Sequence, residues 1–461
     1  MTSLFRREPG FYRRLWALTL PIVLQNLITT SLGFADTFMV GLLGNAEMAA
    51  VTAANVPVFI LQLVIFGFQS GLAVLVSQYW GRGDTDSINR CMGIALYAVT
   101  LFSLTVALVT FFCPAEVLRL VTPNEDLVTL GTSYIRIVGF ANVFNGISSV
   151  YAGMQRSTEN PRFGMILFAI SMCVNTFLNY VLIFGKFGAP PMGVTGAAAA
   201  TLISRIVEFA VALLYALRSR RLPLRLGLIL RPGRETFRRF IKYSVPVVCN
   251  ETLWGTGTSM LTVIMGHMDQ SQDMLAAYSL MGNIDKLSTV ICFGLAASAA
   301  VMVGKEIGEG RDFGHVYDVA KTLLAVSVLV GLGVMALQLA LLPTFFRPVL
   351  FPLFQLSPGA ARISTYLAVV YAVALPTRAF DVTNVTGVLR AGGDARVAVL
   401  IDVLPLWLFT VPLMAVCALV LKAPVLWVCV CLQSETVCKF PLGILRFRSR
   451  KWIHDITRSI E

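Results

Sequence analysis

The stretch LTLPIVLQNLITTSLGFADTFMVG, residues 18–41, is long and apolar enough to cross a bilayer as a single helix. It nevertheless carries Pro21, Gln25 and Asn26 and, near its far end, Asp36. A carboxylate inside a membrane helix is costly unless it faces a cavity or a partner, so Asp36 is a candidate functional residue.

A related stretch opens the second half of the chain: YSVPVVCNETLWGTGTSMLTVIMG, residues 243–266. The two stretches align at four positions, which are Pro21 with Pro246, Gln25 with Asn250, Asn26 with Glu251, and Gly41 with Gly266. Each half of the chain therefore begins with a related helix that bears one acidic residue, at a different depth in the two copies.

The composition indicates an integral, polytopic, all-α membrane protein. The chain has 461 residues, of which 56% are hydrophobic and only 13% charged, and its mean hydropathy is +0.75. Soluble proteins average roughly 25% charged residues. Many apolar runs have the length of about 20 residues that crosses a hydrocarbon core. No small-residue cleavage site closes the first apolar segment, so no cleaved signal peptide is expected.

The net charge of +12 does not indicate a nucleic-acid partner. A DNA- or RNA-binding patch needs Lys and Arg gathered on one soluble face, and no segment is long enough to build such a domain. The basic residues instead alternate between loops, as the positive-inside rule expects for cytoplasmic connections. The most basic stretch, residues 218–242, is the predicted joint between two halves.

This alternation predicts about twelve spans with both termini in the cytoplasm. The predicted division is an N-terminal six-helix lobe (1–217), a basic cytoplasmic linker (218–242), a C-terminal six-helix lobe (243–445) and a cytoplasmic tail (446–461). The spans are expected near residues 18–43, 51–80, 92–112, 134–154, 163–184, 196–217, 243–265, 277–303, 320–342, 365–389, 397–419 and 425–445.

Loops after corresponding spans also match, which supports an internal repeat. The aligned residues are Gly81 and Gly83 with Gly308 and Gly310, and Gly153, Arg156 and Arg162 with Gly387, Arg390 and Arg396. An even number of spans per repeat gives both copies the same orientation. The sequence therefore predicts two bundles related by a pseudo-twofold axis along the membrane normal.

Three polar residues in the first half are expected to accompany Asp36. Asn175 and Asn179 are four residues apart and share one face of the fifth predicted helix. Thr201 lies in the small-residue run GAAAATLIS, which allows close helix approach. Together with the Asp36 carboxylate they could form an oxygen cage for Na⁺ or an extended proton network. The alternative is plain hydrogen bonding between helices.

The second half places Glu251, Asp381 and Asp402 inside spans, with few intramembrane bases to match them. Such acids suggest protonation, a bound cation, or attraction for cationic substrates. Arg378, one turn from Asp381, offers an alternative in which these two residues form a static ion pair. Residues expected to line a substrate cavity are Gln25, Asn26, Trp254, Met260 and Asp402, with Phe380 and Trp407 as further apolar candidates.

An enzyme is the weaker class. The chain has no G-x-x-x-x-G-K-[ST] loop and no Ser–His–Asp or His–Glu–x–x–His pattern. The nine Cys and three His lack the spacing of a metal site. No cofactor is therefore expected apart from a coupling ion.

The stretch FADTFMVG, the loop VSQYWGRGD, PVVCNETLWGTGTSM, VGKEIGEG and GVLRAGGDAR resemble multidrug and toxic compound extrusion (MATE) transporters of bacterial type, over essentially the whole chain. The resemblance implies two six-helix bundles, a V-shaped central cavity and rocking between outward- and inward-open states. It implies a monomer in the bacterial inner membrane that exports cationic or amphipathic compounds in exchange for H⁺ or Na⁺.

By the same resemblance, Asp36 matches the first-helix carboxylate of the family, and Asn175, Asn179 and Thr201 match its N-lobe polar network. Glu251 matches the seventh-helix acid, and Asp381 falls where some members have a tenth-helix acid. Some members carry Asp at the position of Asn179, so both coupling ions stay open. A lipid-linked oligosaccharide flippase of related topology is the alternative, but it would need a strongly cationic cavity for pyrophosphate, and the intramembrane charges here are mainly acidic.

Overall fold

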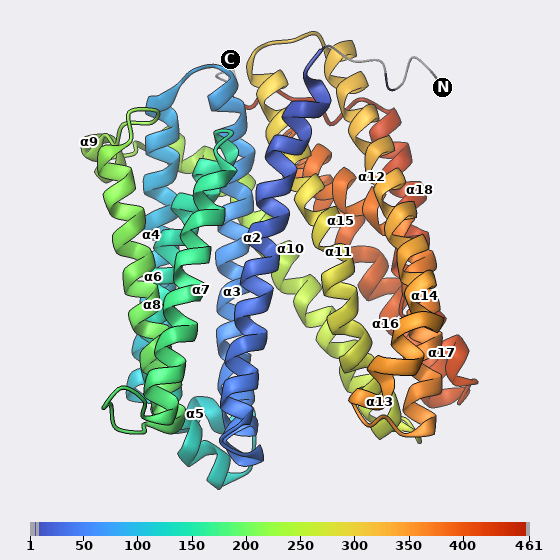
Figure 1. Ribbon diagram of the computed structural model, residues 1–461. Helices are drawn as coiled ribbons and strands as arrows, with labels where there is room; N and C mark the ends of the chain where they lie inside the picture. Colours follow the sequence, from blue (N-terminus) through green and yellow to red (C-terminus); the bar gives the residue numbers. More distant parts are fainter. Residues whose placement is uncertain (1–4, 6–8, 458–461) are drawn as a thin grey trace. The chain divides into compact units, whose positions relative to one another are not determined.

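The computed structural model describes residue 5 and residues 9–457, and the regular structure of this part of the chain is entirely helical (Figure 1). Within the described residues, 11 helices are long and apolar enough to cross a membrane. A further long helix, α10 (Arg234–Gly266), has 33 residues but is less apolar, because it begins with a basic stretch and carries Asn250 and Glu251. The prediction of an all-α membrane protein with about twelve spans is confirmed.

The helices of the first half are longer at their ends than predicted. Helix α6 begins at Glu125 because the Asn124 side chain caps it, accepting from the backbone N–H groups of Asp126 and Leu127. Helix α10 begins nine residues before the predicted Tyr243, inside the predicted linker. The elements are α2 (Phe11–Gly41), α3 (Asn45–Gly81), α4 (Thr85–Phe112), α5 (Pro114–Arg119), α6 (Glu125–Ser157), α7 (Pro161–Phe184), α8 (Gly193–Arg218), α9 (Leu226–Leu230) and α10 (Arg234–Gly266).

The helices of the second half are interrupted by π-helical segments (η). The last predicted span, 425–445, is divided into α17 and α18 by a turn at Leu432 and Gln433. Two of the four π segments, η1 and η3, contain or directly adjoin a proline, whose missing N–H removes an α-helical hydrogen bond. The elements are α11 (Ser271–Gly308), α12 (Phe313–Leu341), η1 (Leu342–Leu350), α13 (Phe351–Leu353), α14 (Pro358–Val382), η2 (Thr383–Leu389), α15 (Ala395–Pro405), η3 (Leu406–Thr410), α16 (Val411–Ala415), η4 (Val416–Val420), α17 (Val425–Cys431) and α18 (Ser434–Arg448).

The chain forms two compact units. We call Leu24–Glu251 the N-terminal unit, and Met1–Val23 with Thr252–Glu461 the C-terminal unit. Helices α2 and α10, the first helices of the two repeats, therefore each contribute one end to each unit. The division into lobes at residues 217 and 243 stays a prediction.

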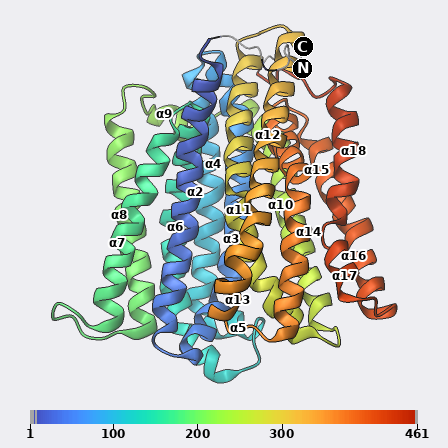
Figure 2. The same cartoon turned by 45° about the vertical axis from the view of Figure 1, so that its right-hand side comes forward.

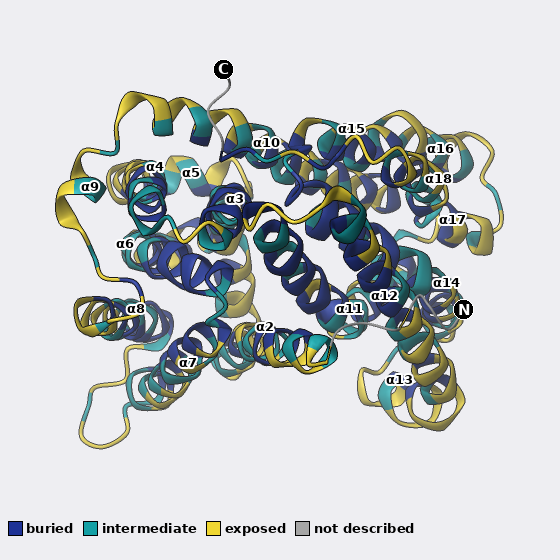
Figure 3. Ribbon diagram, turned by 90° about the horizontal axis from the view of Figure 1, so that it is seen from above, coloured by how far each residue is buried: buried dark blue, intermediate teal, exposed yellow. Residues whose placement is uncertain are grey.

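Close packing at small residues holds each unit together. In the C-terminal unit, the Thr19 hydroxyl of α2 donates to Ser298 Oγ of α11 at 2.9 Å. A Cβ added to Gly331 of α12 would lie 2.7 Å from the Cα of Pro376 on α14. In the N-terminal unit, a Cβ on Gly67 of α3 would lie 2.7 Å from the Cα of Val248 on α10. Membrane helices associate through such close contacts because lipid is as apolar as the side chains. In Figure 3 much of α3 and α11 is coloured as buried.

The repeated glycine loops have a common backbone geometry. After α3, Gly83 adopts φ +73° and Asp84 caps α4 by accepting from the backbone N–H of Ser87. After α11, Gly310 adopts φ +74° and Asp312 caps α12 in the same manner. Left-handed φ values at a helix C-terminus favour glycine, and Asp is a strong N-cap. The similarity of these loops in sequence therefore reflects the same helix stop and start.

Candidate functional site

A chain of polar side chains connects three helices of the N-terminal unit. Asn179 of α7 donates to Asp36 Oδ1 of α2 at 2.5 Å and to Asn175 Oδ1 at 3.0 Å. Asn175 in turn donates to the hydroxyls of Thr201 and Ser204 on α8, at 3.4 and 3.5 Å. The structure thus brings together the four residues that the sequence singled out in this half and adds Ser204.

Local sequence explains how these residues meet. Asn175 and Asn179 lie one above the other because four residues complete about one helical turn. Helix α8 approaches α7 closely at the small-residue run, where a Cβ on Gly196 would lie 2.6 Å from the backbone oxygen of Leu182. This contact lets the short side chain of Thr201 reach α7.

The chain of polar groups leaves one oxygen without a partner. Asn175 and Asn179 are each 1% exposed, and Asn179 Oδ1 is buried with no hydrogen-bond partner. An unpaired buried acceptor is costly, typically by about 1–3 kcal/mol. One carboxylate and amide oxygens can take a proton or a small monovalent cation. No group of three or more His, Cys, Asp or Glu side chains that could hold a metal ion occurs among the described residues.

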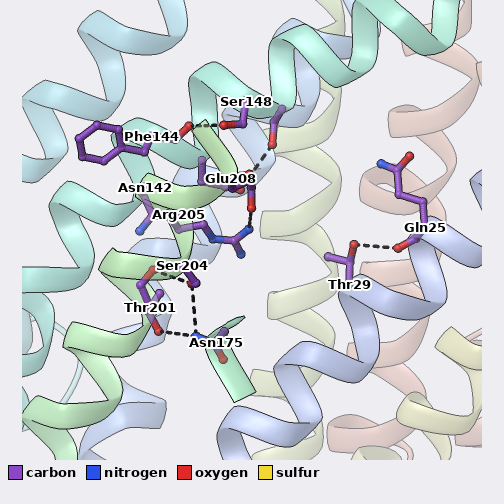
Figure 4. A network of polar contacts seen from close by, with 12 residues as sticks. Gln25, Thr29, Asn142, Phe144, Ser148, Asn175, Thr201, Ser204, Arg205 and Glu208 are labelled. Atoms are coloured by element: carbon purple, nitrogen blue, oxygen red, sulfur yellow. Dashed lines mark hydrogen bonds and ion pairs between the residues drawn. The ribbon is translucent and has the colours of Figure 1, made fainter. Parts of the chain in front are cut away.

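A buried ion pair lies beside these hydrogen-bonded side chains. The sequence did not single out either of its residues. Arg205 Nη1 and Glu208 Oε2, both on α8, are 2.6 Å apart, and the Glu208 side chain is fully buried (Figure 4). Glu208 Oε1 has no hydrogen-bond partner in the described structure. Both residues fall inside the predicted span 196–217, so the rule that singled out Asp36 would also have found them. Arg205 directly follows Ser204 and places a fixed positive charge next to the polar chain.

The C-terminal unit pairs its charges differently from the prediction. Arg378 of α14 does not form the alternative pair with Asp381 but donates two hydrogen bonds to Asp285 of α11, at 2.6 and 3.0 Å. Asp381 is 6% exposed, and neither of its carboxylate oxygens has a hydrogen-bond partner in the described structure. The expectation of few intramembrane bases was wrong, because Lys439 of α18 is buried and lies 2.8 Å from Asp402 Oδ1.

The residues predicted to line a substrate cavity are distributed over both units. Gln25 and Asn26 lie on α2 in the N-terminal unit and are partly buried, with Gln25 close to Gly164 of α7. Trp254 packs at the edge of an apolar core in the C-terminal unit, where Met260 is 38% exposed.

Two of the predicted acids lie in different compact units. Asp402 belongs to the C-terminal unit, where its ion pair with Lys439 occupies one carboxylate oxygen. Glu251 lies on α10 at the end of the N-terminal unit and is partly buried.

An apolar groove of about 460 Å³ runs between α2 and α7 in the N-terminal unit. Its lining includes Leu24, Ile28 and Ile170 and no charged side chain. The groove is therefore distinct from the hydrogen-bonded polar side chains at Asp36.

A carboxylate buried inside a polytopic helical membrane protein and hydrogen-bonded to an amide marks a candidate ion or substrate pathway. The MatE family model matches the chain twice, over residues 21–181 and 246–416, and the two matches begin at the aligned prolines Pro21 and Pro246. The chain belongs to the MatE family of multidrug and toxic compound extrusion (MATE) transporters.

Relatives match over almost the full length. The chain is 25% identical to the probable multidrug resistance protein NorM of Thermotoga maritima, over 96% of this chain and 94% of the relative. It is 24% identical to the uncharacterized transporter YisQ of Bacillus subtilis, over 95% and 94%. It is 25% identical to the multidrug resistance protein MdtK of Yersinia enterocolitica, over 87% and 86%.

Solved structures share the fold. The outward-facing conformation of a multidrug resistance MATE family transporter of the MOP superfamily superimposes with a TM-score of 0.83 at 18% identity, covering 97% of this chain and 98% of that chain. A MOP superfamily transporter from Pyrococcus furiosus, described as having reverse polarity of its binding pocket, gives 0.84 at 17% identity with the same coverage. The MATE fold predicted from the sequence is confirmed.

Proposed function

We propose that the protein is a secondary active multidrug efflux antiporter in the bacterial inner membrane. It exports cationic or amphipathic compounds in exchange for H⁺ or Na⁺ by rocker-switch alternating access, with both termini in the cytoplasm. Support comes from relatives named as multidrug resistance proteins and from the hydrogen bond between Asp36 and Asn179.

The Asp36–Asn179 contact is the observation on which the proposal depends. An ionised Asp36 accepts the Asn179 N–H, whereas a protonated Asp36 can also donate to an acceptor. The unpaired Oδ1 of Asn179 is an acceptor within the same pair of side chains, available to a donor or a cation after a small rearrangement. Gain of a proton or Na⁺ therefore changes the hydrogen bonding that joins α2 to α7.

Thermodynamic linkage between ion binding and the conformational state explains how this local change can drive transport. An ion shifts the balance between outward- and inward-open states only if it binds the two states with different affinity. We assign the coupling role to Asp36, Asn175, Asn179 and Thr201 in the N-terminal unit, with Glu251 and Asp381 as further coupling acids.

The test is transport of a fluorescent cationic dye in proteoliposomes, with a pH gradient and a Na⁺ gradient imposed separately. Antiport predicts that at least one inward ion gradient drives dye against its own gradient, and that dissipating this gradient stops the movement. Dye movement that follows only its own gradient under both conditions would overturn the proposal.

A further inference from the structure

Four ionisable side chains of the C-terminal unit form a cluster in which Lys439 and Arg390 are buried and Asp402 and Glu435 are partly buried. Lys439 Nζ lies 2.8 Å from Asp402 Oδ1 and 3.2 Å from Glu435 Oε2. The Lys439 side chain is only 7% exposed. Arg390 adds a more distant contact of 3.8 Å to Asp402 Oδ2. The ammonium of Lys439 therefore occupies the space between two carboxylates.

Helices α14 and α18 lie against each other (Figure 1; Figure 2), and Asp381, on α14, is flanked in sequence by two residues that contact α18. Asn384, three residues beyond Asp381, donates to the backbone oxygen of Gly443 at 3.1 Å, and Gly443 is one turn beyond Lys439 on α18. The ring of Phe380 meets the ring of Phe440 with centroids 5.0 Å apart. These two contacts place the part of α14 and η2 around Asp381 against α18, the helix that carries Lys439 and Glu435.

The α14 side of this interface carries oxygens that lack partners. Both carboxylate oxygens of Asp381 and Asn384 Oδ1 are buried without a hydrogen bond in the described structure. Thr383 and Asn384 begin the π-helical segment η2, and π segments recur at functional positions in helices. A buried carboxylate with no donor is costly unless a proton or a positive charge compensates it.

We propose that the Lys439 ammonium is the resident cation of the C-terminal unit: it takes the position among Asp402, Glu435 and Asp381 that an alkali cation would otherwise occupy, and so excludes Na⁺ from this unit. When Asp381 releases its proton, Lys439 moves from Asp402 and Glu435 toward the new carboxylate. One proton leaves, no metal ion enters, and Arg390 stays beside Asp402. The inference rests on the proposed antiport, since it specifies which ion this unit can exchange.

The chemistry of the two cations explains the exclusion. Lys is a compact, strongly hydrated point charge with three donors on a flexible stem, so one ammonium can satisfy several carboxylates in turn. A tethered ammonium is present at every turnover and needs no concentration in solution, so free Na⁺ competes with it at a disadvantage. Removing the ammonium leaves Glu435 and the unpaired oxygens of Asp381 without their nearby positive charge, with only the more distant Arg390 beside Asp402, and such a group of oxygens attracts a hard monovalent cation.

The test measures Na⁺ binding directly, through the thermal unfolding midpoint of purified protein in NaCl and in choline chloride at matched ionic strength. An Asp36→Asn background removes the N-terminal carboxylate from the comparison. In this background, Lys439→Gln is expected to add a sodium-dependent rise of roughly 2–4 °C. Lys439→Arg keeps a positive charge in the cluster and is expected to add none.

A second variant provides the test if Lys439→Gln alone does not fold. Glu435→Gln/Lys439→Gln removes one negative and one positive charge, so the net charge of the cluster is unchanged, and Asp381 and Asp402 remain as ligands. It is also expected to show the added sodium-dependent rise, and a further Asp381→Asn change is expected to remove it. Equal sodium-dependent shifts in the folded variants and in the Asp36→Asn parent would overturn the inference.

The two proposals fail in different measurements. If the sodium-dependent shifts of the variants equal that of the Asp36→Asn parent while the wild-type protein drives dye with an ion gradient, the role of Lys439 is wrong. The antiport proposal then still holds. If the Lys439→Gln variants show the added sodium-dependent shift but the wild-type protein transports dye only down the dye's own gradient, the antiport proposal is wrong. The proposed role of the Lys439 ammonium then still holds.

Discussion

Arg378 and Asp285 form a bidentate ion pair that connects α14 to α11 inside the C-terminal unit, with contacts of 2.6 and 3.0 Å. The side chains are only 24% and 16% exposed. Bidentate geometry of this kind is specific to arginine and a carboxylate. Because Arg378 is engaged by Asp285, it is not the partner of Asp381, whose carboxylate oxygens have no hydrogen-bond partner in the described structure.

The first prediction concerns the stability that this pair provides. Removing one partner leaves a buried charge uncompensated, so Arg378→Met is expected to cost about 3–5 kcal/mol. The double variant Arg378→Met/Asp285→Leu should recover most of the loss, because it removes both charges. The exposed pair Lys422–Asp269, at 3.0 Å with side chains 67% and 74% exposed, is the matched control, and Lys422→Met should cost about 1 kcal/mol or less. Thermal unfolding in detergent measures all three, and equal midpoints for Arg378→Met and Lys422→Met would contradict the prediction.

The second prediction tests the coupling role of Asp36. Asp36→Asn keeps the shape of the side chain but can neither gain nor lose a proton. Gradient-driven dye efflux in proteoliposomes should fall by about 10-fold or more, within the range of typical coupling free energies. Asp126→Asn, at an exposed carboxylate in the first turn of α6, should transport normally. Wild-type efflux by an Asp36→Asn protein present at normal abundance would remove Asp36 from the mechanism.

The third prediction asks what decides between the two ions at Asp36. Asn179→Asp would place a second carboxylate where an amide now donates to Asp36 at 2.5 Å. Two carboxylates at that distance repel unless a proton or a cation lies between them. We expect Asn179→Asp to lower the Na⁺ concentration that gives half-maximal efflux by about 10-fold, equivalent to about 1.4 kcal/mol. Asn179→Ala removes the donor without adding charge and should weaken efflux without this change. If both variants respond to Na⁺ alike, the added carboxylate does not select the ion.

The sequence predicted best what depends on local spacing. The bilayer-length runs predicted the helices, and the four-residue spacing of Asn175 and Asn179 predicted their common face, which their 3.0 Å hydrogen bond confirms. Partners that come from distant helices were not predictable in this way. Asp285 lies 93 residues before Arg378, and no local pattern joins them. Lys439 was within a predicted span but was not paired with Asp402, because that contact crosses from α18 to α15.

Helix ends were the least predictable part of the fold. Hydropathy marks where a helix crosses the apolar layer, whereas its ends are set by caps and turns outside that layer. Helix α6, which Asn124 caps, begins at Glu125, nine residues before the predicted span 134–154. The C-terminal segment was likewise expected to be a simple tail. In the structure Arg446 contacts Asp394 at 2.6 Å, and the His454 backbone N–H donates to the Gly392 oxygen at 2.8 Å.

The last prediction uses this packing of the C-terminal segment on the loop after η2. A Cβ added to Gly392 would lie 2.4 Å from Cε3 and 2.5 Å from the backbone oxygen of Trp452, whose side chain is fully buried. Gly392→Ala should therefore displace the segment, lower the stability by about 1–3 kcal/mol and speed tryptic cleavage after Lys451. Gly282→Ala on α11 is the matched control, because a Cβ there meets nothing within 4 Å and alanine is favoured over glycine inside a helix. It should leave cleavage unchanged. Gly392→Ala/Trp452→Ala should still be less stable than Trp452→Ala alone, because the backbone oxygen of residue 452 stays 2.5 Å from the added Cβ after the ring is removed. If Gly392→Ala resists trypsin as well as the wild-type protein does, the loop can move aside and the segment is not held by this contact.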